Sequence, residues 1–229
     1  MPQLTSWSYS RLLDYEKCPY RVKLQFIDKV PVTPHPAVER GLAVHKASED
    51  FIKGIINEIP PEYAPFEAKM LYLRDSYRAG KTVVEEEWAF TSNWESCDWK
   101  DSRAWLRLKL DAFVRVSPAH GVVVDHKTGK KSGNEIKHSE QGLLYAAVCY
   151  MKFPELERVT TEFNYVDQKE DSVVNFSPKQ AARAIIMFEK RAHKMLKDTE
   201  FRPRPNIFNC RFCPYGPRGT GDCKVACPT

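Results

Sequence analysis

The stretch from Trp105 to Lys130 limits the possible folds of this chain more than any other segment. Residues 106–116 (LRLKLDAFVRV) alternate apolar and polar side chains with a period of two, which is typical of a half-buried β-strand. Residues 122–124 are three valines, which suit a more fully buried strand. The intervening sequence SPAHG has the composition of a turn. The segment therefore predicts two neighbouring strands joined as a hairpin.

Three charged residues accompany this hairpin. Alternate side chains of a strand share a face, so Asp125 and Lys127 are expected to point the same way. If Asp111 pairs across from either of them, two carboxylates and an ammonium meet, whereas a slip of one residue would turn Asp111 to the opposite face. Facing carboxylates repel unless a cation lies between them, and oxygen ligands favour Mg²⁺ or Mn²⁺. The pattern is consistent with metal-assisted phosphoryl chemistry; its simpler interpretation is an ordinary charged hairpin.

The hairpin is preceded by predicted helices and one strand. Two short helices are expected up to residue 27, followed by the proline-containing loop 31–36. A long helix follows at 37–56, with His45 beside its apolar stripe. A further helix at 64–79 and a strand at 81–90 complete this half of the chain, and residues 91–104 are expected to be irregular.

After the hairpin, a lysine-rich loop leads to an amphipathic helix at 137–151. Gln141 and Tyr145 lie four residues apart in it and so project from one face. A strand at 158–166 and a helix at 178–197 follow. This order predicts an α/β sandwich on a mixed sheet, and no glycine-rich phosphate loop follows any strand, so the sequence gives no support for ATP binding.

Cysteines and charge narrow the class of protein. Four of the seven cysteines stand in the last twenty residues, at 210, 213, 223 and 227. In a reducing compartment such a group favours a metal or cluster over disulfides. The sequence contains no signal-peptide core and no membrane-length apolar run, so we expect an intracellular protein without a membrane partner. The net charge of +5 permits an anionic partner.

Taken together and in order, these motifs resemble the PD-(D/E)XK nucleases, most closely the RecB and Cas4 exonuclease branch. The resemblance rests on His45, Asp111, Asp125-His126-Lys127 and the segment QGLLY at 141–145, with YEKCPYR around Cys18 and CRFCP at 210–214. It runs from residue 18 to residue 223. It implies a restriction-endonuclease-like core, a mixed central sheet flanked by helices, in one nuclease domain of residues 1–229. Residues 28–200 would form the catalytic core.

The resemblance also implies roles for individual residues. His45, Asp111 and Asp125 would hold Mg²⁺ or Mn²⁺, together with the backbone carbonyl of His126. Lys127 would position or activate the attacking water. Gln141 and Tyr145 would contact the scissile region of the nucleic acid. In the family, glycine often precedes the first acidic residue of this strand, whereas in this chain Leu110 precedes Asp111.

The same resemblance implies a 4Fe–4S cluster that holds residues 1–27 against residues 201–229. Its ligands would be Cys18, Cys210, Cys213 and Cys223. In the family, the last cysteine commonly follows the third by about five residues. Here the interval between Cys213 and Cys223 is longer, and Cys227 is an alternative to Cys223. A zinc site made by the four tail cysteines is a second alternative, because thiolates suit zinc as well.

The function expected from this resemblance is a metal-dependent DNA exonuclease of single strands or free ends. It would serve recombination, repair or CRISPR-type DNA processing in a bacterium, archaeon or phage. Lys130, Lys131, Lys137 and Arg183 are candidates to follow the phosphates, and Trp94 and Trp99 are candidates to stack on bases. A non-catalytic nucleic-acid-binding module with a zinc tail, and a subunit active only with a helicase or recombination partner, are the alternatives.

Overall fold

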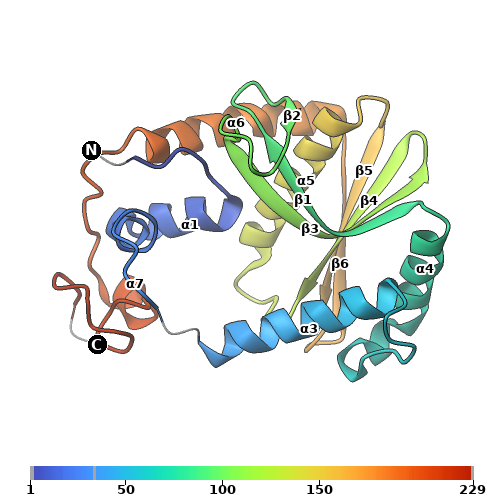
Figure 1. The fold of residues 1–229 in the computed structure, drawn as a ribbon, viewed down its shortest axis with the longest axis horizontal. Coiled ribbons are helices and arrows are strands. Elements are labelled where there is room, and N and C mark those ends of the chain that lie inside the picture. The colour runs from blue at the N-terminus through green and yellow to red at the C-terminus, as the bar shows by residue number, and fades with distance from the viewer. Residues whose placement is uncertain (1–2, 33–34, 228–229) are drawn as a thin grey trace.

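The computed structural model describes residues 3–32 and 35–227, and a six-stranded sheet lies at its centre (Figure 1). The strand order is β2-β1-β3-β4-β5-β6. Their bounds are β1 Thr82–Phe90, β2 Ser96–Cys97, β3 Leu106–Ser117, β4 His120–Lys127, β5 Arg158–Tyr165 and β6 Glu170–Phe176. Among these six strands, β4 and β5 pair in parallel and the other neighbours pair antiparallel. Helix α5 (Glu135–Lys152) makes the crossover between β4 and β5. The sheet is mixed, as the sequence predicted.

Helices cover both faces of this sheet. On one face α3 (Pro36–Ile52) and α4 (Glu67–Arg78) pack over a core that includes Phe51, Met70 and Leu73. The short 3₁₀-helix Pro61–Phe66 joins them. On the other face α5 and α6 (Pro178–Leu196) pack over the larger core. A capping box at Ser177 and Gln180 fixes the start of α6.

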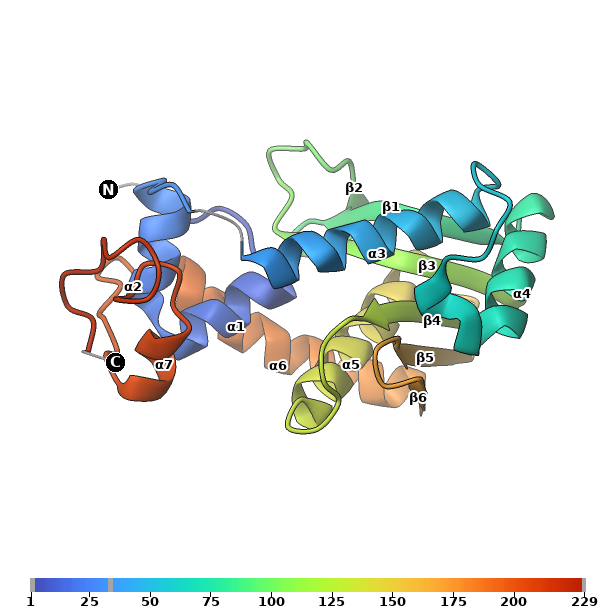
Figure 2. The ribbon, with the colours of Figure 1, turned by 90° about the horizontal axis from the view of Figure 1, so that it is seen from below.

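The N-terminal helices and the C-terminal segment lie together beside this sandwich. Figures 1 and 2 show α1 (Tyr9–Lys17), α2 (Pro19–Val22) and α7 (Ile207–Arg211) together at the end of the molecule away from α4. A π-helical turn, Lys23–Ile27, continues α2. Trp7, Leu12 and Tyr15 also belong to the larger hydrophobic core. The N-terminal helices therefore contact both the C-terminal segment and the sheet.

The buried side of β3 changes near its middle, and this change leaves room for polar groups. Ala112 and Val114 pack into the core beneath α3 and α4, whereas Leu108 and Leu110 pack into the core beneath α5 and α6. In a regular strand all four would share one face. Asp111 lies at the point where the buried side switches. The carboxylate of Asp111 therefore lies between the two apolar cores and belongs to neither.

The sequence predicted most of these elements and missed three. It did not predict β2, β6 or α7, which are short or strongly polar. The helix expected at 37–56 ends at Ile52, and the one expected at 137–151 begins earlier, at Glu135. The helix expected from residue 64 begins as the 3₁₀ turn that contains Pro65, because proline lacks the N–H that an α-helix needs.

Candidate active site

The hairpin brings Asp111 and Asp125 together in the register that the sequence required. Ala112 pairs with Val124, so the next position places Asp111 opposite Asp125. The backbone N–H of His126 donates a hydrogen bond of 2.7 Å to Asp111 Oδ2. Burial, and then the charge of Asp125, raise the pKa of the Asp111 carboxyl. Asp125 is buried and the Asp111 side chain is 14% exposed, so the two facing carboxylates favour binding of a cation between them.

His45 reaches this pair from α3. Its Nδ1 lies 3.2 Å from Asp111 Oδ1. Burial alone would lower the pKa of His45, but the hydrogen bond and the charge of Asp111 outweigh it and raise that pKa. The histidine that was beside the apolar stripe of the predicted helix therefore faces the carboxylates.

Glu85 joins the same group from β1, and the sequence analysis did not identify it. Val84 pairs with Ala112 and Glu86 with Leu110, which puts Glu85 opposite Asp111. One ligand atom each from His45, Glu85 and Asp111 lie within 4.8 Å of one another, the spacing that a single ion requires. Glu85 has a φ of 56°, a left-handed conformation that is uncommon in residues other than glycine. Because Glu85, Glu86 and Glu87 are consecutive, the sequence does not show which of them points to the site. Only the pairing of β1 with β3, which puts Glu85 opposite Asp111, could have identified it.

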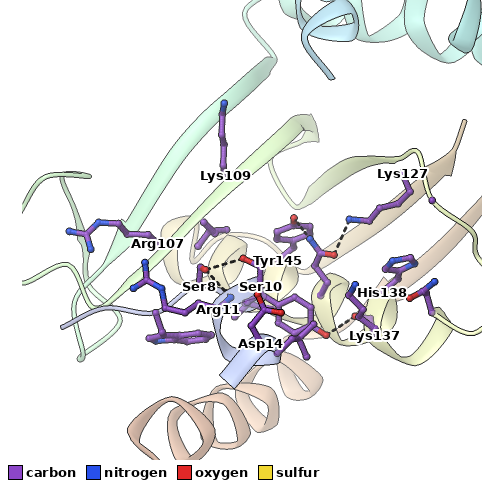
Figure 3. Close-up of a pocket in the computed structure, with 18 of the residues that line it drawn as sticks. Ser8, Ser10, Arg11, Asp14, Arg107, Lys109, Lys127, Lys137, His138 and Tyr145 are labelled. Carbon is purple, nitrogen blue, oxygen red and sulfur yellow. Dashed lines mark hydrogen bonds between the residues drawn. The ribbon is translucent and has the colours of Figure 1, made fainter. Parts of the chain in front are cut away.

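A hydrogen-bonded network surrounds Asp125 on the side of α5. Lys127 Nζ lies 2.6 Å from Asp125 Oδ2. Tyr145 donates its hydroxyl to Asp125 Oδ1 at 2.8 Å, and Gln141 Nε2 approaches the same oxygen at 3.3 Å. Gln141 Oε1 accepts a hydrogen bond of 3.0 Å from Lys127, as Figure 3 shows. The motif residues that the sequence separates by up to twenty positions thus form one connected group.

The side chain of His126 lies apart from this network. It is 1% exposed and its Nε2 lies 3.1 Å from Ser48 Oγ. Burial, and then the charge of His45, lower the pKa of His126 to about 3, so the ring is neutral. The imidazole therefore belongs to the core beneath α3, and the backbone carbonyl remains the group through which His126 would reach an ion.

A cavity of about 780 Å³ opens onto these residues. His45, Lys127, Gln141 and Tyr145 line it together with residues of α1 and β3. Its wall carries a series of cationic side chains, which are Arg11, Lys17, Arg107, Lys109, Lys127, Lys130 and Lys137. The volume is within the range of pockets that hold drug-sized ligands and cofactors. The charge of its wall suits an anionic ligand.

The residues proposed to contact nucleic acid fall into two groups. Lys130, Lys137 and Trp99 line the cavity. The expectation for Trp94 was wrong, because this residue is buried and its indole N–H donates to Glu189 Oε1 at 2.7 Å. Lys131 and Arg183 do not belong to the described cavity lining, and Arg183 lies on the exposed face of α6.

A second, small cavity is lined by Cys18, Cys210, Cys213 and Cys223, the four cysteines named by the family resemblance. Across the described residues, however, no three cysteine sulfurs lie within 4.8 Å of one another. Cys227 donates its backbone N–H to Cys210 Sγ at 3.3 Å and does not line this cavity. Soft thiolates from both ends of the chain fit an iron–sulfur cluster or zinc as a donor set.

Comparisons with known proteins bear on the family and the fold of the chain. The family model described as the PD-(D/E)XK nuclease superfamily matches residues 6–218. No curated protein matches the chain. The crystal structure of a Eubacterium rectale protein described as a candidate exonuclease superposes with a TM-score of 0.54 at 14% identity, covering 98% of this chain and 91% of that one. The crystal structure of SSO0001 gives a TM-score of 0.48 at 15% identity, covering 100% and 90%. Within the described residues, no helix is long and apolar enough to cross a membrane.

Proposed function

Because the chain belongs to the PD-(D/E)XK nuclease superfamily, we propose that it is a divalent-metal-dependent deoxyribonuclease that acts on single-stranded or free DNA ends. The observation that carries this proposal is the meeting of His45, Glu85 and Asp111 beside the Asp125–Lys127 pair, at the mouth of a cavity with a cationic wall. Nucleases of this superfamily use divalent metals, and this His/Glu/Asp group could bind one.

The donor set fits Mg²⁺ or Mn²⁺. Carboxylate oxygens are the ligands that these ions prefer, and an imidazole is an acceptable additional ligand for Mn²⁺. His45, Asp111 and Asp125, with the carbonyl of His126, would hold the ion, and Glu85 would add a further carboxylate. When bound, it would neutralise charge on the scissile phosphate and lower the pKa of a water molecule. The repulsion between Asp111 and Asp125 is the physical reason for the ion to bind there.

Lys127, Gln141 and Tyr145 act around that centre. The ammonium of Lys127 would orient the attacking water or stabilise the negative charge that develops on the phosphate. Gln141 accepts a hydrogen bond from Lys127 and donates to Asp125, so it fixes both groups relative to each other. Tyr145 donates to Asp125, and burial, followed by the Asp125 charge, raises the pKa of Tyr145, which keeps its hydroxyl a donor. Gln141 and Tyr145 also line the cavity, where the nucleic acid would lie.

End-directed cleavage and the RecB/Cas4 branch are the more specific parts of the proposal. Support for exonuclease activity comes from the Eubacterium rectale protein, which shares the fold and is described as a candidate exonuclease. Recombination, repair or CRISPR-type processing are pathways that use such an enzyme.

A 4Fe–4S cluster ligated by Cys18, Cys210, Cys213 and Cys223 is the matching structural proposal. Its support is that these four cysteines line one cavity, which Cys227 does not. The cluster would join α1 and α2 to the C-terminal segment, so that binding it contributes to folding. Visible absorbance of freshly purified protein distinguishes iron–sulfur from zinc, because zinc is colourless.

Digestion of end-labelled and circular DNA tests the enzymatic proposal. Wild-type protein is expected to degrade linear single-stranded DNA with Mn²⁺ or Mg²⁺ and to leave closed circles intact. Asp125→Ala and Lys127→Ala are each expected to lose at least about 100-fold in rate, since the first weakens the metal site and the second removes the ammonium that stabilises charge on the reacting phosphate. Glu87→Gln, an exposed residue of β1, is the control expected to retain full activity.

Two results would contradict the proposal. Full activity in both variants would exclude this centre. DNA binding without any cleavage, in wild type and variants alike, would favour the non-catalytic binding module with a zinc tail.

A further inference from the structure

Two arginines lie side by side on the cavity wall. Arg11 comes from α1 and Arg107 from β3, and both line the cavity that Lys127 and Tyr145 also line. Figure 3 shows them near Ser8 and Ser10. They are close enough that the charge of Arg107, added to burial, lowers the pKa of Arg11. Neighbouring guanidinium groups repel each other, so this arrangement needs an explanation.

Neither guanidinium has an acidic partner within the described part of the chain. No carboxylate oxygen there lies within 4.0 Å of either arginine. Arg11 donates to the backbone carbonyl of Ser6 at 2.6 Å, and its buried Nε has no hydrogen-bond partner. Arg107 Nε donates to the carbonyl of Trp99 at 2.8 Å, and its Nη2 donates to the backbone carbonyl of Asp101 at 3.4 Å. Asp14, the acid that lines the same cavity, is paired with Arg21 at 3.0 Å.

Both side chains are nevertheless held in place. The Arg11 guanidinium lies over the ring of Phe26 at 4.0 Å, and three backbone carbonyls accept from the two forks. Each arginine therefore keeps donors that these contacts leave free. Ser8 and Ser10 add two hydroxyls, 3.2 Å apart, on the same wall. An ordered pair of forks with free donors matches the geometry of a phosphate group.

We propose that Arg11 and Arg107 form a phosphate-binding subsite for the DNA strand whose scissile phosphate lies at Asp111, Asp125 and Lys127. This proposal rests on the proposed function, because it assumes that the strand being cut occupies the cavity. The phosphate is either an internal one of that strand or its terminal one, and the two share the same chemistry. The subsite would fix the strand at a second point and so set its register relative to the bond that is cut.

Binding of a fluorescent single-stranded oligonucleotide tests this subsite, with Ca²⁺ in place of Mg²⁺ to slow cleavage. Arg107→Gln and Arg11→Gln are each expected to weaken binding about tenfold and to reduce the slope of log K against log salt by about 0.7, the value for one lost phosphate contact on a single strand. Arg107→Lys keeps a positive charge and is expected to restore the slope in part. Arg78→Gln removes an exposed arginine of α4, outside the cavity, and is the matched control, expected to bind like wild type.

Oligonucleotides with a 5′-phosphate or a 5′-hydroxyl identify which phosphate is bound. If wild type prefers the 5′-phosphate oligonucleotide and Arg107→Gln does not, the subsite binds the terminal phosphate. If Arg107→Gln loses the same affinity for both oligonucleotides, the subsite binds an internal phosphate. A structural role alone would lower the melting temperature without changing the salt slope. Variants that keep the wild-type affinity and slope, in a protein that still cleaves DNA, would overturn the subsite. Wild type that neither binds nor cleaves DNA would overturn the proposed function itself.

Discussion

Replacing Glu85 by glutamine tests whether the residue that the sequence did not reveal takes part in metal binding. The change removes one negative charge and keeps the size of the side chain. Glu85 has a ligand atom within 4.8 Å of those of His45 and Asp111, and its side chain is 13% exposed. Its one ion pair, with Lys109 at 2.5 Å, involves a half-exposed lysine, so losing that pair costs little by itself. The expected effect is therefore on metal binding and not on the fold.

The size of the effect follows from linkage. Loss of a group that merely supports a metal ligand costs about 10- to 100-fold in affinity, so loss of a ligand should cost at least about tenfold. At a Mn²⁺ concentration of about 100 times Kd, binding stabilises the folded state by about 2.7 kcal/mol. A tenfold weaker site leaves about 1.4 kcal/mol at the same concentration. Since 1 kcal/mol shifts Tm by about 2–4 °C in a domain of this size, the Mn²⁺-induced rise in Tm should shrink by about 3–5 °C.

Thermal unfolding in EDTA and in Mn²⁺ measures the Mn²⁺-induced rise in Tm, and isothermal titration measures the affinity for Mn²⁺. Glu87→Gln makes the same change of charge two residues further along β1 on an exposed side chain, and it should keep the full Mn²⁺ response. Glu85→Gly also removes the ligand but suits the φ of 56°, so its Tm in EDTA should not fall far below that of wild type. If Glu85→Gln gains as much stability from Mn²⁺ as wild type does, Glu85 is not a ligand.

Three further predictions concern the scaffold. Cys18→Ser is expected to give colourless, poorly soluble protein, while Cys97→Ser, outside the cysteine cavity, keeps wild-type absorbance; a coloured, soluble Cys18→Ser would remove the cluster from the proposal. Gly142→Ala should lower stability by about 1–3 kcal/mol in urea unfolding, because its Cβ would lie 2.6 Å from Thr161 Oγ1 where α5 packs on β5; an unchanged midpoint would mean that α5 shifts freely. Burial lowers the pKa of His138 to about 4, so the unfolded state binds more protons and stability should fall as pH decreases from about 6.5 to about 4. His138→Gln should flatten the dependence of Tm on pH in that window, and an equally steep curve would exclude His138 as a source.

The sequence alone was sufficient for most of the elements and for their order. Period-two alternation in residues 106–116 predicted β3, and the three valines predicted β4, because a strand with one buried face and a strand with two require those patterns. The spacing of four between Gln141 and Tyr145 placed both on one face of α5, and their contacts with each other and with Asp125 agree. These features depend on local geometry, which a linear pattern records.

Other features depended on tertiary structure. Strand β6 has exposed or half-exposed residues along most of its length, so it carries no clear alternation, and its pairing with β5 is what stabilises it. Trp94 looked like a base-stacking residue in a polar segment, yet it packs in the core against Trp105. Hydrophobicity alone does not tell an aromatic side chain in a binding cavity from one in a core.

The sequence by itself determined which chemical groups were available: a histidine, carboxylates, a lysine and cysteines in a recognisable order. Only the tertiary structure decided which of them meet. The pairing of β1 with β3 put Glu85 rather than Glu86 or Glu87 beside Asp111, and the packing of α1 against the sheet put Arg11 beside Arg107. The physical reason is that strand register and helix packing bring together residues far apart in sequence, and no local pattern along the chain encodes those distances.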